Sequence, residues 1–354
     1  MFRHVADLYP GTPVFTSLFD RAVAGDFVDP ARVRTSPLQA LPLATRYFRY
    51  LAPLYPAAFE SFDLSPYDLI VSTTTSWAKG VRFRPDAVHV CYIHTVSRFA
   101  FAYERYVGGF APMRGGLLAR AGRPLVDRLV AWDRRAALRP TAYIANSANV
   151  AARVAKYYGR EALVAHCPVD VERFAVGDGS GDYALVVSRL LGYKRIDLAI
   201  AGCARAGMRL LIVGAGPARD ELERAAAGTR TEFLGALSDA ALRAVMGRAR
   251  VVVLPGEEDY GLVPLEAAAS GRPAIAYGRG GALETIVPGR TGEYFAHDDP
   301  ESLARELRAF DPARYDPAVL RAHAESFGPG PFKRRFARLV DGIVASARPR
   351  DLAR

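Results

Sequence analysis

The chain has 354 residues, half of them hydrophobic and 24% charged, which is enough for two domains with separate cores. No apolar run reaches the length of a membrane span, and residues 1–5 begin no secretory signal. The three cysteines have no metal-like spacing, so we expect reduced core residues and a cytoplasmic protein.

The net charge of +10 is concentrated in the first part of the chain, where residues 1–170 hold 21 basic and 13 acidic residues. Residues 98–160 alone hold twelve basic and three acidic residues. Aromatic residues are interleaved with these charges: Phe99, Phe101, Tyr103, Tyr106, Phe110 and Trp132. This pattern suits peripheral contact with an anionic membrane surface or a phosphate-bearing acceptor, and solvated arginine-rich helix faces are the alternative. No nucleic-acid-binding motif accompanies it, so we expect no nucleic acid partner.

The first 175 residues begin with the end of an amphipathic helix over 1–9. Strands are then predicted over 14–17, 67–72, 87–93, 142–147 and 163–165, with a helix over 148–158. The strand at 67–72 is followed by a small polar run, and the strand at 87–93 delivers His94 at its carboxyl end. A lone histidine in such a place is more often structural than functional.

A glycine-rich linker over 176–182 separates this part from the second half. The second half alternates strands and helices regularly: strand 183–188, helix 195–206, strand 209–213, helix 217–227, strand 231–234, helix 238–247 and strand 250–254. Such alternation with short connections predicts an α/β fold with a parallel, doubly wound sheet. A last helix is predicted over 332–345, after a glycine–proline break at 328–331.

The most informative stretch is the strand–loop–helix–strand unit over 251–277. Its loop ends at Gly261, and the helix that follows leaves backbone N–H groups at its N-terminus, where an anion is stabilised. Glu258 in the loop and Glu266 in the helix are suited to accepting hydrogen bonds from vicinal hydroxyls. An anion cradle with two such carboxylates favours a nucleotide sugar. The alternative is that Glu266 complements the helix dipole and Glu258 is a solvated loop charge.

Two further groups lie at predicted strand ends. Arg189 and Lys194 follow the strand at 183–188 and could direct two cations at one anion, although a surface pair is the plain alternative. Gly214 and Gly216 form a glycine turn after the next strand. This turn is half of a dinucleotide fingerprint, and Arg219 occupies the place of the third glycine, so it is weak evidence for NAD.

The string EEDYGLVPLEAAASGRPAIAYGRGGALETIVPGRTGEYF, residues 257–295, resembles the E-x7-E region of the retaining family 4 glycosyltransferases. The resemblance implies the GT-B fold, in which two Rossmann-like doubly wound domains face a central cleft and a C-terminal helix crosses back. It predicts an acceptor-side domain over 1–175, a nucleotide-sugar-binding domain over 182–328, and a terminal segment over 329–354 that packs on the first domain.

The same resemblance implies roles for the residues that match. Arg189 and Lys194 would bind the donor diphosphate, Glu258 the sugar hydroxyls and Glu266 the ribose. The remaining donor-binding positions would be Gly214, Gly216, Phe233, Leu234, Gly261, Leu262 and Val263. No cofactor and no metal are expected, and transfer would proceed by attack on the face from which the diphosphate leaves, because no carboxylate of the second domain has the spacing of a nucleophile.

The segment CYIHT, residues 91–95, resembles a bacterial subgroup that transfers mannose in polysaccharide assembly, and similar text surrounds Trp132 and residues 144–160. It implies that His94 lies in the cleft and that the donor is GDP-mannose. Residues 96–100 depart from the subgroup pattern, which puts the sugar and the acceptor in doubt. The family also begins with a strand and a glycine-rich loop that this sequence does not show. Either the start codon is misassigned, or the chain is a degenerate nucleotide-sugar-binding protein. A GT-B sugar-nucleotide epimerase or phosphorylase shares this architecture and is a further alternative.

Overall fold

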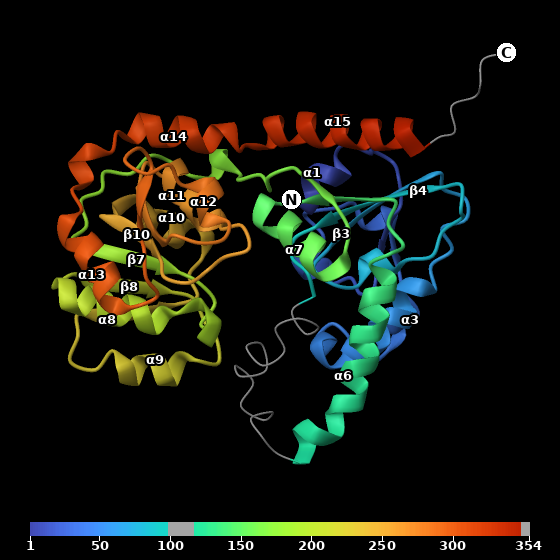
Figure 1. The fold of residues 1–354 in the computed structure, drawn as a ribbon, viewed down its shortest axis with the longest axis horizontal. Helices are drawn as coiled ribbons and strands as arrows, with labels where there is room; N and C mark the ends of the chain where they lie inside the picture. Colours follow the sequence, from blue (N-terminus) through green and yellow to red (C-terminus); the bar gives the residue numbers. More distant parts are fainter. Residues whose placement is uncertain (98–116, 348–354) are drawn as a thin grey trace. The chain divides into compact units, whose positions relative to one another are not determined.

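The structure is a computed structural model that describes residues 1–97 and 117–347, with the side chains of 117–122 left undescribed. The chain forms two compact units, shown in Figure 1. Within the described residues, unit 1 contains 1–97, 117–166 and 332–347, and unit 2 contains 167–331. The break after His166 precedes the predicted linker at 176–182, which lies inside unit 2.

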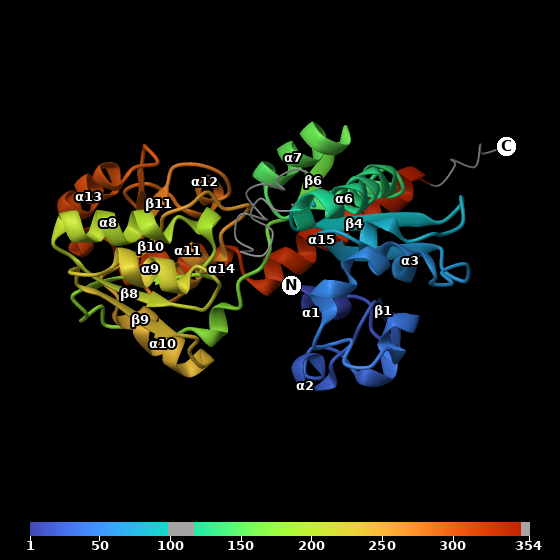
Figure 2. The same cartoon turned by 90° about the horizontal axis from the view of Figure 1, so that it is seen from below.

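Unit 1 is built on a parallel four-stranded sheet in the order β3 (Leu69–Thr74), β4 (Val88–Ile93), β5 (Ala142–Ala145) and β6 (Ala162–Val164). Every residue of β4 is buried, as expected for a parallel strand covered on both faces. Strands β1 (Val14–Thr16) and β2 (Val33–Thr35) form a separate two-stranded parallel sheet (Figure 2). Strand β3 ends at Thr74, beyond the predicted end at residue 72, because the polar threonines are β-branched and pair with Tyr92 and Ile93.

The helices of unit 1 vary from single turns to a long helix. The α-helices are α1 (Phe2–Ala6), α2 (Arg21–Ala24), α3 (Tyr55–Glu60), α6 (Leu117–Ala136), α7 (Ala148–Tyr158) and α15 (Pro329–Ala347). The 3-10 helices are η1 (Pro30–Arg32), η2 (Pro37–Ala40), η3 (Phe48–Leu54) and η4 (Ala78–Gly80). Helix α7 is capped at both ends. The Ser147 side chain before it accepts a hydrogen bond from the Val150 N–H, and Gly159, whose φ is +63°, follows its last residue.

The C-terminal helix α15 contributes to the core of unit 1. Its buried side chains Phe332, Phe336, Val340 and Ile343 pack with Val90, Tyr92 and Ile144 of the sheet. Each buried aromatic side chain contributes roughly 1.5–3 kcal/mol of hydrophobic stabilisation. The break between α14 and α15 lies at residues 327–328 and is shorter than the predicted break at 328–331, because α15 already begins at Pro329. Prolines are tolerated there since the first-turn N–H groups have no partner within a helix.

Unit 2 contains one six-stranded parallel sheet in the order β12-β11-β10-β7-β8-β9. The strands are β7 (Tyr183–Val187), β8 (Arg209–Val213), β9 (Thr231–Gly235), β10 (Val251–Leu254), β11 (Ala274–Tyr277) and β12 (Gly292–Phe295). The helices are α8 (Ile196–Ala206), α9 (Arg219–Ala225), α10 (Asp239–Arg248), α11 (Leu262–Ala269), α12 (Ala282–Thr285), α13 (Pro300–Ala309) and α14 (Pro317–Ser326), with 3-10 helices η6 (Val171–Arg173), η7 (Gly192–Lys194) and η8 (Pro312–Arg314). The sequence predicts this α/β alternation, and the structure confirms it.

Candidate functional site

The strand order of unit 2 reverses at the connection from β9 to β10. From β7 the chain moves outward through β8 to β9, then returns to the other side of β7 as β10 and moves outward again (Figure 1). In doubly wound sheets, ligands bind at the carboxyl ends of the strands where the order reverses. The segments that leave this point follow β7 and β10, and they contain Lys194 and Glu258.

Lys194 and Glu258 form an ion pair between the Lys194 Nζ and the Glu258 Oε1, although 64 residues separate them. Their side chains are only 16% and 20% exposed, so water screens the pair less than it would at the surface. Gly256 permits this approach, because a Cβ there would lie 2.9 Å from the Lys194 carbonyl oxygen. A half-buried cation therefore lies beside a carboxylate at the strand-order reversal.

The loop that holds Glu258 is fixed at both sides. Tyr260 is buried and its hydroxyl donates a hydrogen bond of 2.9 Å to the Cys167 carbonyl. The Glu258 carbonyl accepts a hydrogen bond of 2.8 Å from the Gly281 N–H, and a Cβ on Gly281 would lie 2.3 Å from the Tyr260 Cα. This contact is not predicted from the sequence, although the glycine pair at 280–281 is a visible signal of it.

Helix α11 begins directly after Gly261, which has a φ of +86° and provides no side-chain cap. The N–H groups of the first turn, which include those of Leu262 and Val263, have no acceptor within the helix and form a site where an anion is favoured. Glu266 lies on the next turn. Burial raises the pKa of its carboxyl, and the positive charge of Arg173 partly offsets this.

Arg173 lies close enough to Glu266 to affect its pKa, and the sequence does not predict this. It lies in η6 and forms an ion pair with Asp239 at the start of α10. The stretch around it, PVDVERF (residues 168–174), contains none of the site residues predicted from the sequence. The structure adds that this stretch supplies a positive charge to the surroundings of a buried carboxyl.

The glycine turn after β8 packs on the segment that follows β7. A Cβ at Gly214 would lie 1.9 Å from the Ser188 carbonyl oxygen, and one at Gly216 would lie 2.3 Å from the Leu190 carbonyl oxygen. Gly214 also has a φ of +137° and donates a hydrogen bond of 2.8 Å to the Gly235 carbonyl. The turn is thus required for close backbone packing at the strand ends.

The remaining predicted residues of unit 2 lie on the same edge of the sheet. Phe233 and Leu234 are half-buried in β9, immediately before Gly235. Arg189 follows β7 and is exposed, and within the described chain its guanidinium makes no hydrogen bond or ion pair. The structure therefore joins Lys194 and Glu258 in an ion pair, and in the described part of the chain Arg189 forms no hydrogen bond or ion pair with either of them.

Comparison with known proteins identifies these two units. Residues 12–173 match the Glycosyltransferase Family 4 model, and residues 181–310 match the model for Glycosyl transferases group 1. The sucrose-phosphate synthase of Thermosynechococcus elongatus shares the fold with a TM-score of 0.68 at 19% identity, covering 89% of this chain and 84% of that one. Anabaena HepE in complex with UDP and glucose has a TM-score of 0.65 at 16% identity, covering 96% and 95%. Both units therefore match glycosyltransferase family models, and the chain has the GT-B fold.

Two curated relatives show where sequence similarity lies. A GDP-mannose-dependent alpha-(1-6)-phosphatidylinositol dimannoside mannosyltransferase of Mycobacterium tuberculosis is 37% identical over 139 residues, covering 38% of this chain and 36% of the relative. A D-inositol 3-phosphate glycosyltransferase of Geodermatophilus obscurus is 29% identical over 270 residues, covering 67% and 58%. The matched region thus spans about a third of the mycobacterial protein, 36% of its length.

His94 belongs to unit 1, at the carboxyl end of β4. The His94 backbone N–H donates a hydrogen bond of 2.9 Å to the Thr74 carbonyl, and the His94 backbone carbonyl accepts one of 3.1 Å from the Asn146 side-chain amide. Burial, together with the positive charge of the N-terminus, lowers the pKa of the imidazole to about 4. The ring is therefore neutral near pH 7, and its role in transfer stays a prediction.

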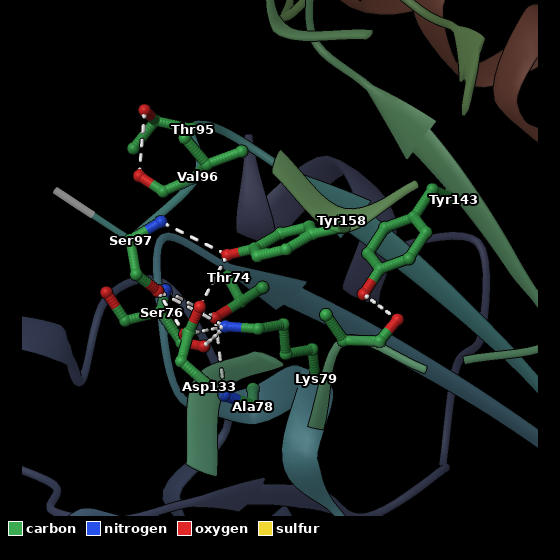
Figure 3. A network of polar contacts seen from close by, with 11 residues as sticks. Thr74, Ser76, Ala78, Lys79, Thr95, Val96, Ser97, Asp133, Tyr143 and Tyr158 are labelled. Carbon is green, nitrogen blue, oxygen red and sulfur yellow. Dashed lines mark hydrogen bonds and ion pairs between the residues drawn. The ribbon is translucent and has the colours of Figure 1, made fainter. Parts of the chain in front are cut away.

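A buried polar network lies under the turn that follows His94 (Figure 3). Lys79 of η4 is fully buried and donates hydrogen bonds to the Ser76 carbonyl, to the Ser97 hydroxyl at 3.2 Å and to Asp133 of α6. Asp133 also accepts hydrogen bonds from Ser97 and, at 2.9 Å, from the Tyr158 hydroxyl. This network joins η4, the turn at 94–97, α6 and α7, and the sequence analysis does not predict it.

The predicted basic and aromatic surface needs a correction. Trp132 is buried and its indole N–H donates a hydrogen bond of 2.7 Å to Glu60, so it belongs to the interior and not to the surface. The other aromatic residues predicted for this surface, between 99 and 110, lie outside the described residues. No helix in the described ranges is long and apolar enough to cross a bilayer.

In residues 1–97 and 117–347, no three His, Cys, Asp or Glu side chains are grouped so that they could hold a metal ion. That the transfer needs no metal and no cofactor stays a prediction.

Proposed function

We propose that this protein is a retaining hexosyltransferase that moves mannose from GDP-mannose to a glycan or lipid-linked acceptor in cell-surface polysaccharide synthesis. The observation that carries the proposal is the half-buried Lys194–Glu258 ion pair beside the first turn of α11 at the strand-order reversal. A cation and open amides suit a diphosphate, and a carboxylate suits sugar hydroxyls.

In the proposed reaction, Lys194, Arg189 and the first-turn N–H groups of α11 neutralise the charge that develops on the leaving diphosphate. Glu258 accepts hydrogen bonds from the sugar and orients the Lys194 ammonium, while Glu266 accepts hydrogen bonds from the ribose hydroxyls. Neutral His94 lies near the sugar and the diphosphate.

The bond changes balance without a further reactant. The bond between the sugar C1 and the β-phosphate oxygen breaks, and the bond between C1 and the acceptor oxygen forms on the same face. The acceptor hydroxyl proton passes to the phosphate oxygen that leaves. The products are the mannosylated acceptor and GDP.

The choice of donor is supported by one relative, which is named as GDP-mannose-dependent. Other relatives are named as glycogen synthase and as D-inositol 3-phosphate glycosyltransferases, and the structural neighbour HepE contains UDP and glucose. UDP-glucose is therefore the competing donor. We place the reaction in the cytoplasm, in keeping with three cysteines that are all free and buried.

The test measures nucleotide release and sugar transfer with purified protein, each of the two donors and a mixture of glycan and lipid-linked acceptors. We expect Lys194→Ala and Glu258→Ala each to lower kcat at least about tenfold, which corresponds to one lost transition-state contact. Matched controls are the exposed Lys156→Ala and Glu221→Ala, which should stay within about twofold of the wild type.

Three outcomes separate the alternatives. Transfer that depends on Lys194 and Glu258 supports the proposal. Binding of the donor without nucleotide release, or release of a free or epimerised sugar without any acceptor, would replace it with the degenerate binding protein or the epimerase. Unchanged rates in both variants would remove the roles assigned to the two residues.

A further inference from the structure

Unit 1 exposes a cluster of large hydrophobic side chains within one short segment. We name it the 41–54 surface after its members Leu41, Leu43, Tyr47, Phe48, Tyr50 and Leu54, which are between 42% and 82% exposed. Single exposed hydrophobic residues are ordinary, whereas six of them within one segment of 14 residues indicate an interaction site. None of these six residues belongs to the candidate site described above.

The charges of this surface have one sign. Arg46 and Arg49 are exposed among the aromatic residues, and their guanidinium groups lie 5.6 Å from the Tyr47 ring and 5.4 Å from the Phe48 ring. The sequence contains no acidic residue between Asp29 and Glu60. A partner that binds this surface must therefore have both apolar groups and negative charge.

The segment is held in place from both sides, so its side chains are not exposed through loss of structure. Ala44 and Tyr55 are buried, and the Tyr55 hydroxyl donates a hydrogen bond of 2.7 Å to the Phe48 carbonyl at the start of η3. Leu43 has a φ of +56°, a conformation that a leucine rarely adopts, and its side chain is 60% exposed. A fixed backbone therefore presents the hydrophobic groups to the outside.

We propose that the 41–54 surface docks on the face of a bilayer that contains anionic phospholipids. Tyrosine and phenylalanine favour the interface between headgroups and acyl chains, and leucine side chains enter the acyl region. Arg46 and Arg49 extend their guanidinium groups to the phosphates, and each arginine strengthens binding to an anionic membrane severalfold. Nucleic acid would fit poorly, because most of this surface is apolar.

This proposal goes beyond the proposed function and does not depend on it, because vesicle binding requires neither donor nor acceptor. It also differs from the sequence-based expectation of a membrane contact through residues 98–160. The two surfaces are separable by mutation, because exposed Arg128 and Arg135 lie on α6 and outside the 41–54 surface.

The experiment is co-sedimentation of the full chain with vesicles of phosphatidylcholine alone and of phosphatidylcholine with about a third phosphatidylglycerol. We expect binding to the anionic vesicles that weakens with added salt. The variant Arg46→Ala/Arg49→Ala should bind about thirtyfold more weakly, and Tyr47→Ser/Tyr50→Ser at least about tenfold more weakly. The matched control Arg128→Ala/Arg135→Ala should bind within about twofold of the wild type.

Each other outcome overturns the proposal. Equal loss in the Arg128→Ala/Arg135→Ala control assigns the contact to α6. Unchanged binding in both variants of the 41–54 surface removes that surface from the contact. Absence of vesicle binding, combined with a dimer in size-exclusion chromatography that Tyr47→Ser/Tyr50→Ser dissociates, identifies a second copy of the chain as the partner. Circular dichroism of each variant establishes that it is folded.

Discussion

Replacing Lys79 by methionine should destabilise unit 1 strongly. The ammonium group is fully buried and has three hydrogen-bond acceptors, of which the Asp133 carboxylate is the charged one. Burial lowers the pKa of Lys79, and Asp133 opposes this. In Lys79→Met the carboxylate stays buried without its counter-charge, although Ser97 and Tyr158 still donate to it.

The expected cost follows from that uncompensated charge. Removing one partner of a buried ion pair costs about 3–5 kcal/mol of unfolding free energy. Two donors remain on Asp133, so we expect the lower end, about 3 kcal/mol. The double variant Lys79→Met/Asp133→Asn contains no buried charge, and its amide oxygen can still accept a hydrogen bond from Ser97. It should recover at least about half of the loss.

The assay uses the two tryptophans of the chain, Trp77 and Trp132. Both belong to unit 1, with ring centroids 5.6 Å apart, and the Lys79 Nζ lies 6.0 Å from the Trp132 ring. Tryptophan fluorescence during urea unfolding therefore reports on unit 1 alone. Lys79→Met should move the transition to lower urea concentration.

The comparison between the single and the double variant tests whether Lys79 and Asp133 are energetically coupled. If Lys79→Met costs less than about 1 kcal/mol, or if the double variant is less stable than Lys79→Met by the full cost of Asp133→Asn, the two groups are not coupled. The reasoning from a buried ion pair would then be wrong. The exposed Lys156→Met is the matched control and should change the unfolding free energy by less than about 0.5 kcal/mol.

Two further predictions concern pH and backbone packing. Burial lowers the pKa of His89 to about 3. As the pH falls from about 6.5 towards 3, His89 therefore takes up a proton in the unfolded chain but stays neutral in the folded chain. Unit 1 should lose about 1.4 kcal/mol of stability per pH unit from this group in that window, and His89→Gln should reduce the slope of stability against pH by that amount. Gly281→Ala places a Cβ 2.3 Å from the Tyr260 Cα, so the loop with Glu258 must shift, and we expect at least tenfold weaker donor binding by calorimetry, about 1.4 kcal/mol.

Each of these predictions has its own control. An unchanged slope in His89→Gln would mean that His89 does not stay neutral in the folded chain. For the glycine, the control is Gly342→Ala in α15, where a Cβ meets no atom within 4 Å, and donor binding should stay at the wild-type level. If Gly281→Ala binds donor as tightly as the wild type, the glycine contact does not position Glu258.

The sequence by itself determined the elements of unit 2 between residues 183 and 277. Strands that are buried on both faces are short runs of β-branched and aliphatic residues, and helices have a regular apolar spacing, so both can be read from local sequence. The loop with Glu258 and the glycine at its end were also visible, because a helix N-terminus after a buried strand is a local pattern. The start of α15 was misplaced because prolines in the first turn of a helix look like a break.

Only the tertiary structure decided which charged groups meet. The Lys194–Glu258 pair depends on β7 and β10 being neighbours, and the choice of neighbour in a sheet is a long-range property. In the same way, Lys79 and Trp132 carry polar groups that are more often exposed, and their burial depends on partners more than fifty residues away, Asp133 and Glu60. Local sequence specifies what a side chain can do, whereas the packing of distant segments fixes its partner, its exposure to water and therefore its chemistry.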